Sequence, residues 1–261
     1  MNDGVCDRTR RAFARATATA AIAGIAGCRG GDTATVSYPD GWSEDGLIDP
    51  DAVRRSHRSV LDARSYEYRL ESVSADGRSD QTNEYVGRVD PTERVAVVRH
   101  QTVYDRTDPD ERRVRDTHRY VADGQTYLKR SGAGVENSYE IEDSGFDDER
   151  YVAGIWPWIE LFRYTQRGRE GSGDTGQLRY TAEELVPDAA EGLGDGWREA
   201  IASGVSADLG VRSDGLLTSA DLTIGTVGET ATFIDLTWSV DGVGTTTVAE
   251  PGWVEHDPME I

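Results

Sequence analysis

Few side chains in this sequence have the types and spacing that metal binding or catalysis requires. The four histidines lie far apart, and no His-Glu-x-x-His motif could hold zinc on one helix face. They are His57, His100, His118 and His256. No serine lies in a Gly-x-Ser-x-Gly sequence, and no Walker loop is present to bind phosphate. We therefore expect no metal site, no cofactor and no enzymatic activity.

Two patterns resemble functional motifs but are better explained as surface. Residues 171–176 match Gly-x-Gly-x-x-Gly, yet no strong strand precedes them and no helix follows, as a dinucleotide-binding loop requires. The acidic runs at 140–143 and 147–149 could act as acid/base pairs, but such runs are expected by chance among 48 acidic residues. We interpret all three stretches as facing solvent.

Cys28 has the clearest predicted chemistry. It ends the sequence Ile25-Ala26-Gly27-Cys28, which looks like a lipobox, where the cysteine thiol receives a lipid and becomes the new amino terminus. The residues before it follow the layout of a signal peptide, with a basic start, an apolar run and small residues. Arg10 and Arg11 in the basic start look like a twin-arginine signal, which exports folded proteins.

The apolar run over residues 16–26 is too short to span a membrane, which takes roughly 20 residues. We therefore predict that residues 1–27 are a twin-arginine/lipoprotein signal peptide that is removed, and that Cys28 anchors the mature protein through its lipid. The expected location is the extracellular face of the cell membrane. Residues 28–37 are polar and glycine-rich, and we expect them to form a flexible tether.

The chain is strongly acidic, with a net charge of −20 at pH 7, and Lys129 is its single lysine. Such a composition is typical of proteins from extreme halophiles, where high salt screens the repulsion between acids. A surface for cations or a basic partner is the alternative, but the acids are spread along the whole chain. The charge argues against nucleic acid as a partner, because phosphates need clusters of Lys and Arg.

The cysteine content excludes redox chemistry in the mature chain. Cys6 lies in the segment expected to be removed, and Cys28 is expected to carry the lipid. No thiol would then remain for a disulfide or for a cysteine–metal site.

The elements expected along the chain begin with a helix and an antiparallel meander. Asp49 before Pro50 is a typical helix start, and a helix over 50–63 places its apolar residues on one side. A two-residue alternation of apolar and polar residues then predicts strands. These begin at residue 66 and continue over 80–89, 95–104, 114–121 and 126–130.

The middle of the chain is expected to be helical and its end to return to strands. We predict a loop over 131–148 and helices over 148–165 that Pro157 interrupts. The later expected elements are an exposed glycine-rich stretch at 168–176, a strand at 177–181, helical turns within 182–203, and strands at 205–211, 216–224, 231–240 and 244–248. Residues 251–254 should pack on the body. The organisation is one β domain over 38–255 with a tail at 256–261.

Aromatic residues are concentrated in the first meander and in the middle helices. They could form an ordinary core, or they could line a concave apolar cavity beneath a helical lid. The candidate lining residues, chosen by two-residue or helical position, are Tyr68, Leu70, Val97, Trp156, Ile159 and Phe162. Their inward orientation is a hypothesis, because a slip of one residue reverses the face of a strand.

Three stretches together carry a resemblance to a known family. They are the lipobox followed by residues 38–46, the expected helix followed by 65–69, and the ending over 243–253. They resemble a haloarchaeal lipoprotein family related to the LolA/LppX-type (LolA-like) lipoprotein carriers. The resemblance implies a fold that is mainly β with accessory helices (α+β), a half-open antiparallel β-barrel with an N-terminal helix and a central helical lid. It covers most of 28–255 and brings no catalytic motif.

The resemblance also implies a function, because the wider family binds acyl chains in the barrel cavity. It implies a membrane-anchored extracellular lipoprotein that binds a lipid or other apolar ligand, and a monomer. A free periplasmic carrier has no anchor, so Cys28 favours local lipid handling over shuttling. The alternative is a structural or protein-interaction surface lipoprotein with a filled core. A buried methylene gains about 0.8 kcal/mol, so lipid binding would need no polar motif.

Overall fold

A computed structural model of the chain provides the fold. It describes residues 37–75, 79–106, 113–133, 135–143, 146, 155–171, 176–186, 204–225 and 233–254. These residues belong to one compact unit, Ser37–Ile261. The expected signal peptide with Arg10 and Arg11, the lipid attachment at Cys28 and the tail at 256–261 lie outside the described residues. No described helix is both long enough and apolar enough to cross a membrane.

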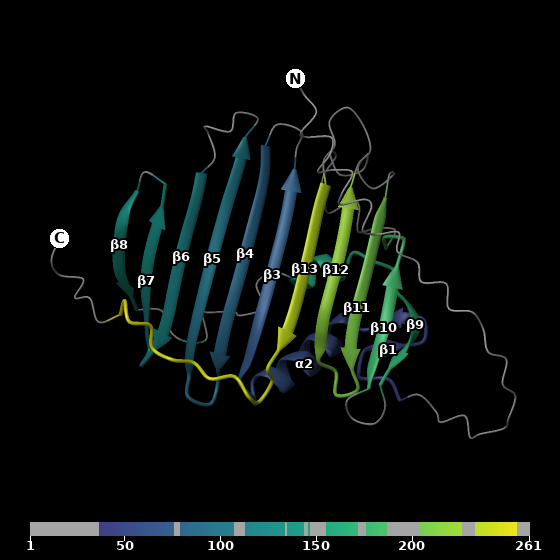
Figure 1. Cartoon of the computed structure of the whole chain (residues 1–261). Helices are drawn as coiled ribbons and strands as arrows, with labels where there is room; N and C mark the ends of the chain where they lie inside the picture. Colours follow the sequence, from purple (N-terminus) through teal and green to yellow (C-terminus); the bar gives the residue numbers. More distant parts are fainter. Residues whose placement is uncertain are drawn as a thin grey trace, which may run out of the picture. The chain divides into compact units, whose positions relative to one another are not determined.

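An eleven-stranded antiparallel sheet is the main element of this unit (Figure 1). Its spatial order is β8-β7-β6-β5-β4-β3-β13-β12-β11-β10-β9. The strands are β3 (Tyr66–Ala75), β4 (Ser79–Asp90), β5 (Val95–Arg106), β6 (Arg113–Ala122), β7 (Gln125–Gly132), β8 (Val135–Glu142), β9 (Thr165–Glu170), β10 (Gln177–Ala182), β11 (Val205–Arg212), β12 (Leu217–Gly225) and β13 (Phe233–Asp241). Because β8 and β9 do not pair, the sheet stays open. This confirms the expected fold class, a mainly β fold with few helices and a half-open antiparallel sheet.

The two halves of the chain meet where β3 pairs with β13. Every other neighbouring pair of strands is consecutive in sequence, so two meanders are joined along one seam. In this register Leu70 lies opposite Trp238, and Tyr68 lies opposite Val240. The seam therefore brings two apolar rows together, and their shared burial fixes how the meanders align.

Three details of the expected element order are wrong. Residues 135–142 form the edge strand β8 instead of a loop, and residues 165–170 form β9, which includes the first three residues of the expected exposed stretch over 168–176. In β8, Tyr139 and Ile141 alternate with acids and pair with Lys129 and Tyr127 of β7. Conversely, 244–248 form no strand in the described structure, and Gly244 has a positive φ of 80° that a regular strand does not adopt.

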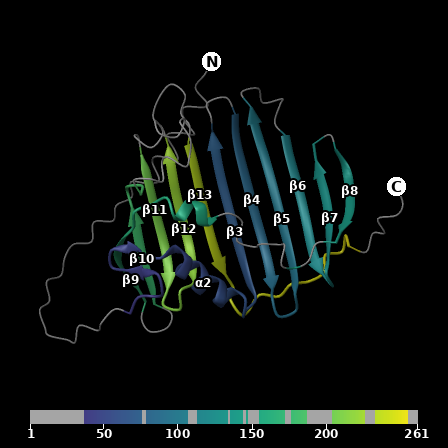
Figure 2. The same cartoon turned by 180° about the vertical axis from the view of Figure 1, so that it is seen from behind.

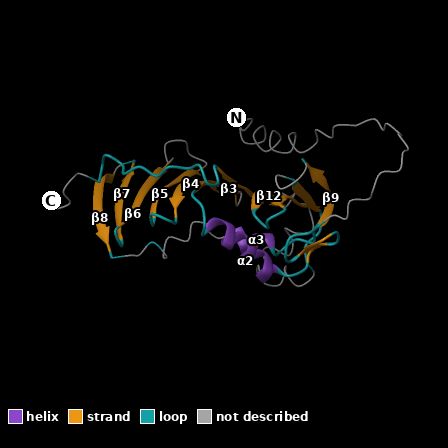
Figure 3. Cartoon of the chain, turned by 90° about the horizontal axis from the view of Figure 1, so that it is seen from below, coloured by secondary structure: helices purple, strands orange, loops and turns teal. Residues whose placement is uncertain are grey.

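Helix α2 (Pro50–Leu61) follows the expected start signal, and the Asp49 carboxylate accepts a hydrogen bond from the Ala52 N–H at 3.0 Å. Its buried residues are Val53, His57 and Leu61, one stripe along the helix. Of the expected central helices over 148–165, the described residues 155–165 form only the short helix α3 (Ile155–Ile159), and Pro157 lies within it instead of interrupting it. Both helices lie on the same face of the sheet (Figures 2 and 3). We call this the helix-side face and the opposite one the far face.

The far face is polar. Arg69 pairs with Glu84, Arg88 with Glu67, and Arg99 with Asp116 across neighbouring strands of the first meander. These side chains alternate along the strands with buried ones such as Tyr66 and Tyr68. Such an alternation is typical of strands that bury one face and expose the other.

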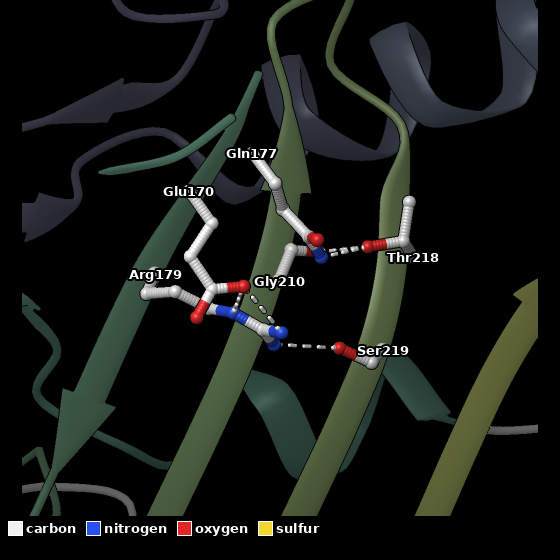
Figure 4. Close-up of polar contacts among 6 residues, drawn as sticks. All are labelled: Glu170, Gln177, Arg179, Gly210, Thr218 and Ser219. Carbon is white, nitrogen blue, oxygen red and sulfur yellow. Dashed lines mark hydrogen bonds and ion pairs between the residues drawn. The ribbon is translucent and has the colours of Figure 1, made fainter. Parts of the chain in front are cut away.

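A polar network also crosses the far face over β9 to β12 (Figure 4). Arg179 binds Glu170 at 3.0 Å and donates to the Ser219 hydroxyl at 3.3 Å, while Gln177 donates to the Thr218 hydroxyl. Gly210 makes this possible, because a Cβ there would lie 1.9 Å from the Gln177 amide nitrogen. The Thr218 hydroxyl in turn donates to the Gly210 carbonyl of β11 at 3.1 Å, so the network links four strands.

The C-terminal segment after β13 crosses one end of the sheet toward β7 and β8 (Figure 1). Trp253 and Val254 line a shallow hollow there together with Tyr127, Tyr139 and Ile141. The three strand residues lie on the far face, since they alternate with Leu128 and Glu140. The expected packing of residues 251–254 on the body is therefore found.

Candidate functional site

Five of the six candidate lining residues lie on the helix-side face or on the elements that cover it. Tyr68 and Leu70 of β3 are buried on that face, beside Val240 and Trp238 of β13. Trp156 and Ile159 belong to α3, and Phe162 lies directly after it. Ile159 and Phe162 are buried, whereas Trp156 is half-buried. The structure thus brings the strand and helix candidates to the same side of the sheet.

Val97 lies on the far face, so its predicted orientation is wrong. It pairs with Arg88 on one side and with Tyr120 on the other, and Arg88 forms the far-face ion pair with Glu67. Its neighbours Ala96 and Val98 are the buried residues of β5 on the helix-side face. Both sets of alternate residues in β5 are apolar, so the sequence did not indicate which set faces inward.

His57 connects α2 with the sheet and with α3. Its ring lies 5.2 Å from the Trp156 ring in an edge-on arrangement and 5.6 Å from the Trp238 ring. The Leu217 N–H donates to His57 Nδ1 at 3.2 Å. Burial lowers the pKa of His57 to about 4, so the ring is neutral at pH 7 and carries its proton on Nε2.

A second aromatic group lies between the sheet and the chain around the short hairpin β1 (Trp42–Ser43) and β2 (Gly46–Leu47). The Trp42 ring is 4.4 Å from Tyr180 of β10 and 6.1 Å from Tyr164. Phe162 lies 6.1 Å from Tyr164 and extends the group toward α3. These rings and the His57 group form one aromatic layer on the helix-side face, made from elements far apart in the sequence.

The aromatic layer contains buried polar atoms that have no hydrogen-bond partner in the structure. They are Trp42 Nε1, Trp238 Nε1, His57 Nε2, Tyr164 Oη and Tyr180 Oη. Burial raises the pKa of both tyrosines, so the two hydroxyls stay protonated. A buried polar group without a partner costs about 1–3 kcal/mol, and nearly all such groups in folded proteins are paired. Each of these atoms carries a proton, so the layer contains five hydrogen-bond donors for which the described residues provide no acceptor.

Beyond the helices, the helix-side face divides into an apolar end and a polar end. At the apolar end the buried residues are Val89, Ala96, Val98, Val121 and Leu128. Phe146 is also buried, and the Arg94 guanidinium lies 5.4 Å from its ring. The Tyr68 ring lies across β4, where Gly87 leaves room because a Cβ would be 2.1 Å from the ring.

The polar end consists of side chains from the same strands β4 and β5. Tyr85 and His100 stack at 3.9 Å with an interplanar angle of 7°. The Thr102 hydroxyl donates to Asn83 Oδ1 at 3.0 Å and lies 3.0 Å from His100 Nε2. Burial, and then the charge of Arg119, lower the pKa of His100, which favours the neutral ring at pH 7. The search for catalytic motifs missed this group, and only the alternation along each strand could have indicated it.

The structure assembles no metal centre from the described residues, in which no three His, Cys, Asp or Glu side chains are placed to share an ion. His100 and His118 lie on neighbouring strands but on opposite faces of the sheet. His100 pairs with Thr117 on the helix-side face, whereas His118 lies on the far face, 3.4 Å from Asp116. The shift of one residue between the two histidines separates them by the thickness of the sheet.

Comparisons with known proteins place the chain in a family but assign no activity. A sequence model described as "Family of unknown function (DUF7537)" matches residues 15–257. No curated protein matches the chain.

Three solved structures are similar to the chain at low sequence identity. LprF from Mycobacterium bovis is 11% identical, with a TM-score of 0.38, and the match covers 80% of this chain and 96% of that one. A beta-barrel-like DUF1849 protein from Brucella abortus is 13% identical, with a TM-score of 0.23 and coverage of 71% and 98%. A DUF1329 family protein from Desulfovibrio piger ATCC 29098 is 11% identical, with a TM-score of 0.25 and coverage of 79% and 95%.

Proposed function

Because the chain belongs to the family of unknown function DUF7537, we propose its function from its own structure: it binds a lipid or another apolar ligand on the helix-side face. The ligand would lie between the open sheet and the elements that cover it, α2, α3 and the segment around Trp42. It needs an apolar body to pack against Tyr68 and Leu70. It also needs a few oxygen atoms that can bind the polar atoms of the aromatic layer.

The observation that carries this proposal is the chemical composition of the aromatic layer. Its rings give a large apolar surface, yet His57 Nε2, Trp238 Nε1 and Tyr164 Oη are buried there without partners. A filled core without ordered water would leave these atoms unsatisfied, at a cost of about 1–3 kcal/mol each. A bound molecule with hydroxyl, ester or carbonyl oxygens would satisfy them while its hydrocarbon part packs on the rings.

Native mass spectrometry of the protein purified from its own host without detergent tests this function. We expect a co-purifying lipid that is lost from the Trp156→Asp variant, because a charge beside His57 opposes apolar binding. Trp253→Asp is the matched control, since Trp253 is also half-buried but lies on the far face. A protein without lipid, or equal loss from both variants, would contradict the proposal.

The second candidate is a structural or interaction lipoprotein with a filled core. Its support is the direct ring contact in the layer, above all Trp42 against Tyr180 at 4.4 Å. Under this reading ordered water would satisfy the buried polar atoms. An empty protein in native mass spectrometry, with water at these atoms in a crystal structure, is the result that would favour it.

The proposed function includes an anchor at the extracellular face of the cell membrane. Its support is the sequence around Cys28, with Arg10 and Arg11 at the start of the same segment. A lipid on Cys28 would keep the binding face close to membrane lipids. The Cys28→Ala variant should therefore move from the membrane to the soluble fraction. Complete retention with membranes would show that another feature holds the protein there.

A further inference from the structure

Large apolar side chains are exposed at only three positions among the described residues. They are Ile48 at 65%, Ile141 at 44% and Val186 at 38%. Ile141 lines the shallow hollow on the far face, whereas Ile48 and Val186 lie on the segments that cover the helix-side face. The most exposed of the three therefore belongs to the cover of the proposed binding site.

Contacts join the segments that carry Ile48 and Val186. Ile48 directly precedes the cap of α2, and Arg54 of this helix forms an ion pair with Glu160, which follows α3. The next residue, Leu161, accepts a hydrogen bond from the Val186 N–H at 2.8 Å. The two exposed side chains thus lie on adjacent segments of the cover.

Helix α3 adds a third exposed apolar residue to this surface. Ile155 and Ile159 are buried one turn apart, so Pro157, midway between them, lies on the opposite side of the helix and is exposed. The half-buried Trp156 and Trp158 flank it, and tryptophan is enriched at the boundary between membrane and water. We call Ile48, Pro157 and Val186 the apolar rim.

The described chain begins beside the same cover. The Tyr38 hydroxyl donates to Gln166 Oε1 of β9 at 2.7 Å, and the Gln166 N–H donates to the Glu44 carbonyl between β1 and β2 at 3.2 Å. Nine residue steps separate Cys28 from Ser37, and an extended chain of that length spans at most roughly 32 Å. A lipid on Cys28 would therefore hold this part of the domain close to a bilayer.

Ion pairs offset acids on the segments that carry the rim. Arg54 binds Glu160, and Arg163 lies 4.0 Å from Glu184, two residues before Val186. Paired charges reduce the repulsion that the acids of this chain would exert on an anionic membrane. An apolar surface edged by such pairs suits a lipid surface better than a partner that is recognised by its charge.

We propose that the apolar rim docks on a lipid bilayer, with its three side chains entering the boundary between water and hydrocarbon. The reach of the tether and the tryptophans beside the rim support this occupant. Docking would turn the cover of the binding site toward the membrane, from which an apolar ligand would enter. The inference rests on the anchor of the proposed function and goes beyond it by naming the surface that meets the membrane.

The test uses the lipidated full chain in phosphatidylcholine vesicles whose acyl chains carry bromine. Once the segment with Cys6 is removed and Cys28 is lipidated, no thiol remains, so one introduced cysteine can carry an environment-sensitive dye. We expect a blue shift and a loss of fluorescence for a dye on Ile48→Cys or Val186→Cys. The matched control is Ile141→Cys, an exposed apolar position on the far face, which should show neither.

A charge on the rim should weaken docking. Ile48→Asp should reduce the quenching of a dye on Val186→Cys, because moving a carboxylate out of water is costly, whereas Ile141→Asp should leave the quenching unchanged. In Cys28→Ala the quenching at equal lipid concentration should fall, because the tether no longer raises the local concentration of the rim. Circular dichroism would check that each variant is folded.

Contrary results separate this inference from the proposed function. Equal quenching on Ile48→Cys and Ile141→Cys, or none on either in a membrane-bound chain, would overturn the rim and leave the anchor and the ligand site standing. A chain that does not stay with the vesicles would overturn the anchor and the rim, while co-purifying lipid would still support the ligand site. A Cys28→Ala dimer in solution that Ile48→Asp converts to a monomer would show that the rim binds a second copy instead.

Discussion

The His57 side chain joins α2 to α3 and to the sheet. It is buried and accepts a hydrogen bond from the Leu217 N–H, and the rings of Trp156 and Trp238 lie next to its own ring. Its pKa falls from the usual 6.5 to about 4 because burial disfavours the charged form. Protonation would therefore place an unpaired cation in the aromatic layer.

This lowered pKa predicts a pH dependence of stability. The unfolded state takes up a proton at His57 near pH 6.5 and the folded state only near pH 4, so stability is full above 6.5 and falls between the two values. The loss amounts to about 3 kcal/mol at 1.36 kcal/mol per pKa unit. In His57→Gln, whose amide oxygen can still accept the Leu217 N–H, this contribution should be absent.

Urea unfolding of the wild type and of His57→Gln from pH 7.5 to 4 measures the effect. The difference in free energy of unfolding should be constant above pH 6.5 and should shrink as the pH falls. His118→Gln controls for a far-face histidine beside Asp116. A difference that does not change with pH would mean that the pKa of His57 is the same in the folded and unfolded states, which would contradict the lowered pKa.

Single residues also show where sequence patterns lose information. In the strand β5, Val95, Val97 and Val103 lie on one face and Ala96, Val98 and Tyr104 lie on the other. Which set is buried depends on the partners, and here Val89 and Val121 align with Ala96. Tyr68 and Leu70 were placed on the correct face, because charged residues alternate with them and only one set of alternate residues in this part of β3 is apolar.

Among the elements, the strands with a clear alternation and turn signals were predictable, and the edges were not. The helix α2 and the strands β3 to β7 follow from Asp49-Pro50 and from period-two patterns. The edge strand β8 was missed because its acids made it look like a loop, although Tyr139 and Ile141 alternate with them. The order β3-β13 could not be predicted, because pairing between distant segments leaves no local signal.

Two strands of the second meander place like charges directly opposite each other. Asp208 of β11 pairs in register with Asp221 of β12 on the far face. Partial burial, and then the charge of Asp221, raise the pKa of Asp208, which Arg179 and Arg167 only partly offset. A raised acid pKa means that the folded state holds the proton more tightly, so stability falls as the pH rises through it.

Asp221→Asn should therefore stabilise the fold at neutral pH and low salt. Facing like charges cost a few tenths to about 1 kcal/mol, and the Asp208 site is partly exposed, so the lower part of that range applies. The gain in melting temperature should fade as the pH falls toward the ordinary pKa of an aspartate, about 4, because the raised pKa of Asp208 keeps its carboxyl protonated there. Asp143→Asn, which removes the same charge at the exposed end of β8, should give less, and an equal gain would indicate a general charge effect.

At the scale of the whole molecule, the acids are concentrated on the far face of the described sheet. The helix-side face is apolar at one end and polar at the other, with Glu140 and Glu142 on the edge strand β8, so the net charge of −20 is not spread evenly. The candidate site was predictable in its apolar half, from Tyr68, Leu70, Trp156, Ile159 and Phe162. The polar group of Tyr85, His100 and Thr102 was not predicted, because sequence motifs connect neighbours in sequence, whereas this group depends on which residues of β4 and β5 share a face.

The excess of acids predicts that the fold depends on salt. Repulsion among acids disfavours the compact state, and it is screened over about 10 Å at 0.1 M salt but over about 3 Å at 1 M. The melting temperature should therefore rise steeply between about 0.1 and 1 M KCl, and hydrophobic burial should continue to strengthen where the salt is excluded from the surface. Sodium sulfate at equal ionic strength separates the two effects, because screening depends on ionic strength whereas exclusion depends on the anion. A melting temperature that stays constant from about 0.1 to 4 M KCl would contradict the prediction and would mean that the ion pairs of the far face already balance the repulsion.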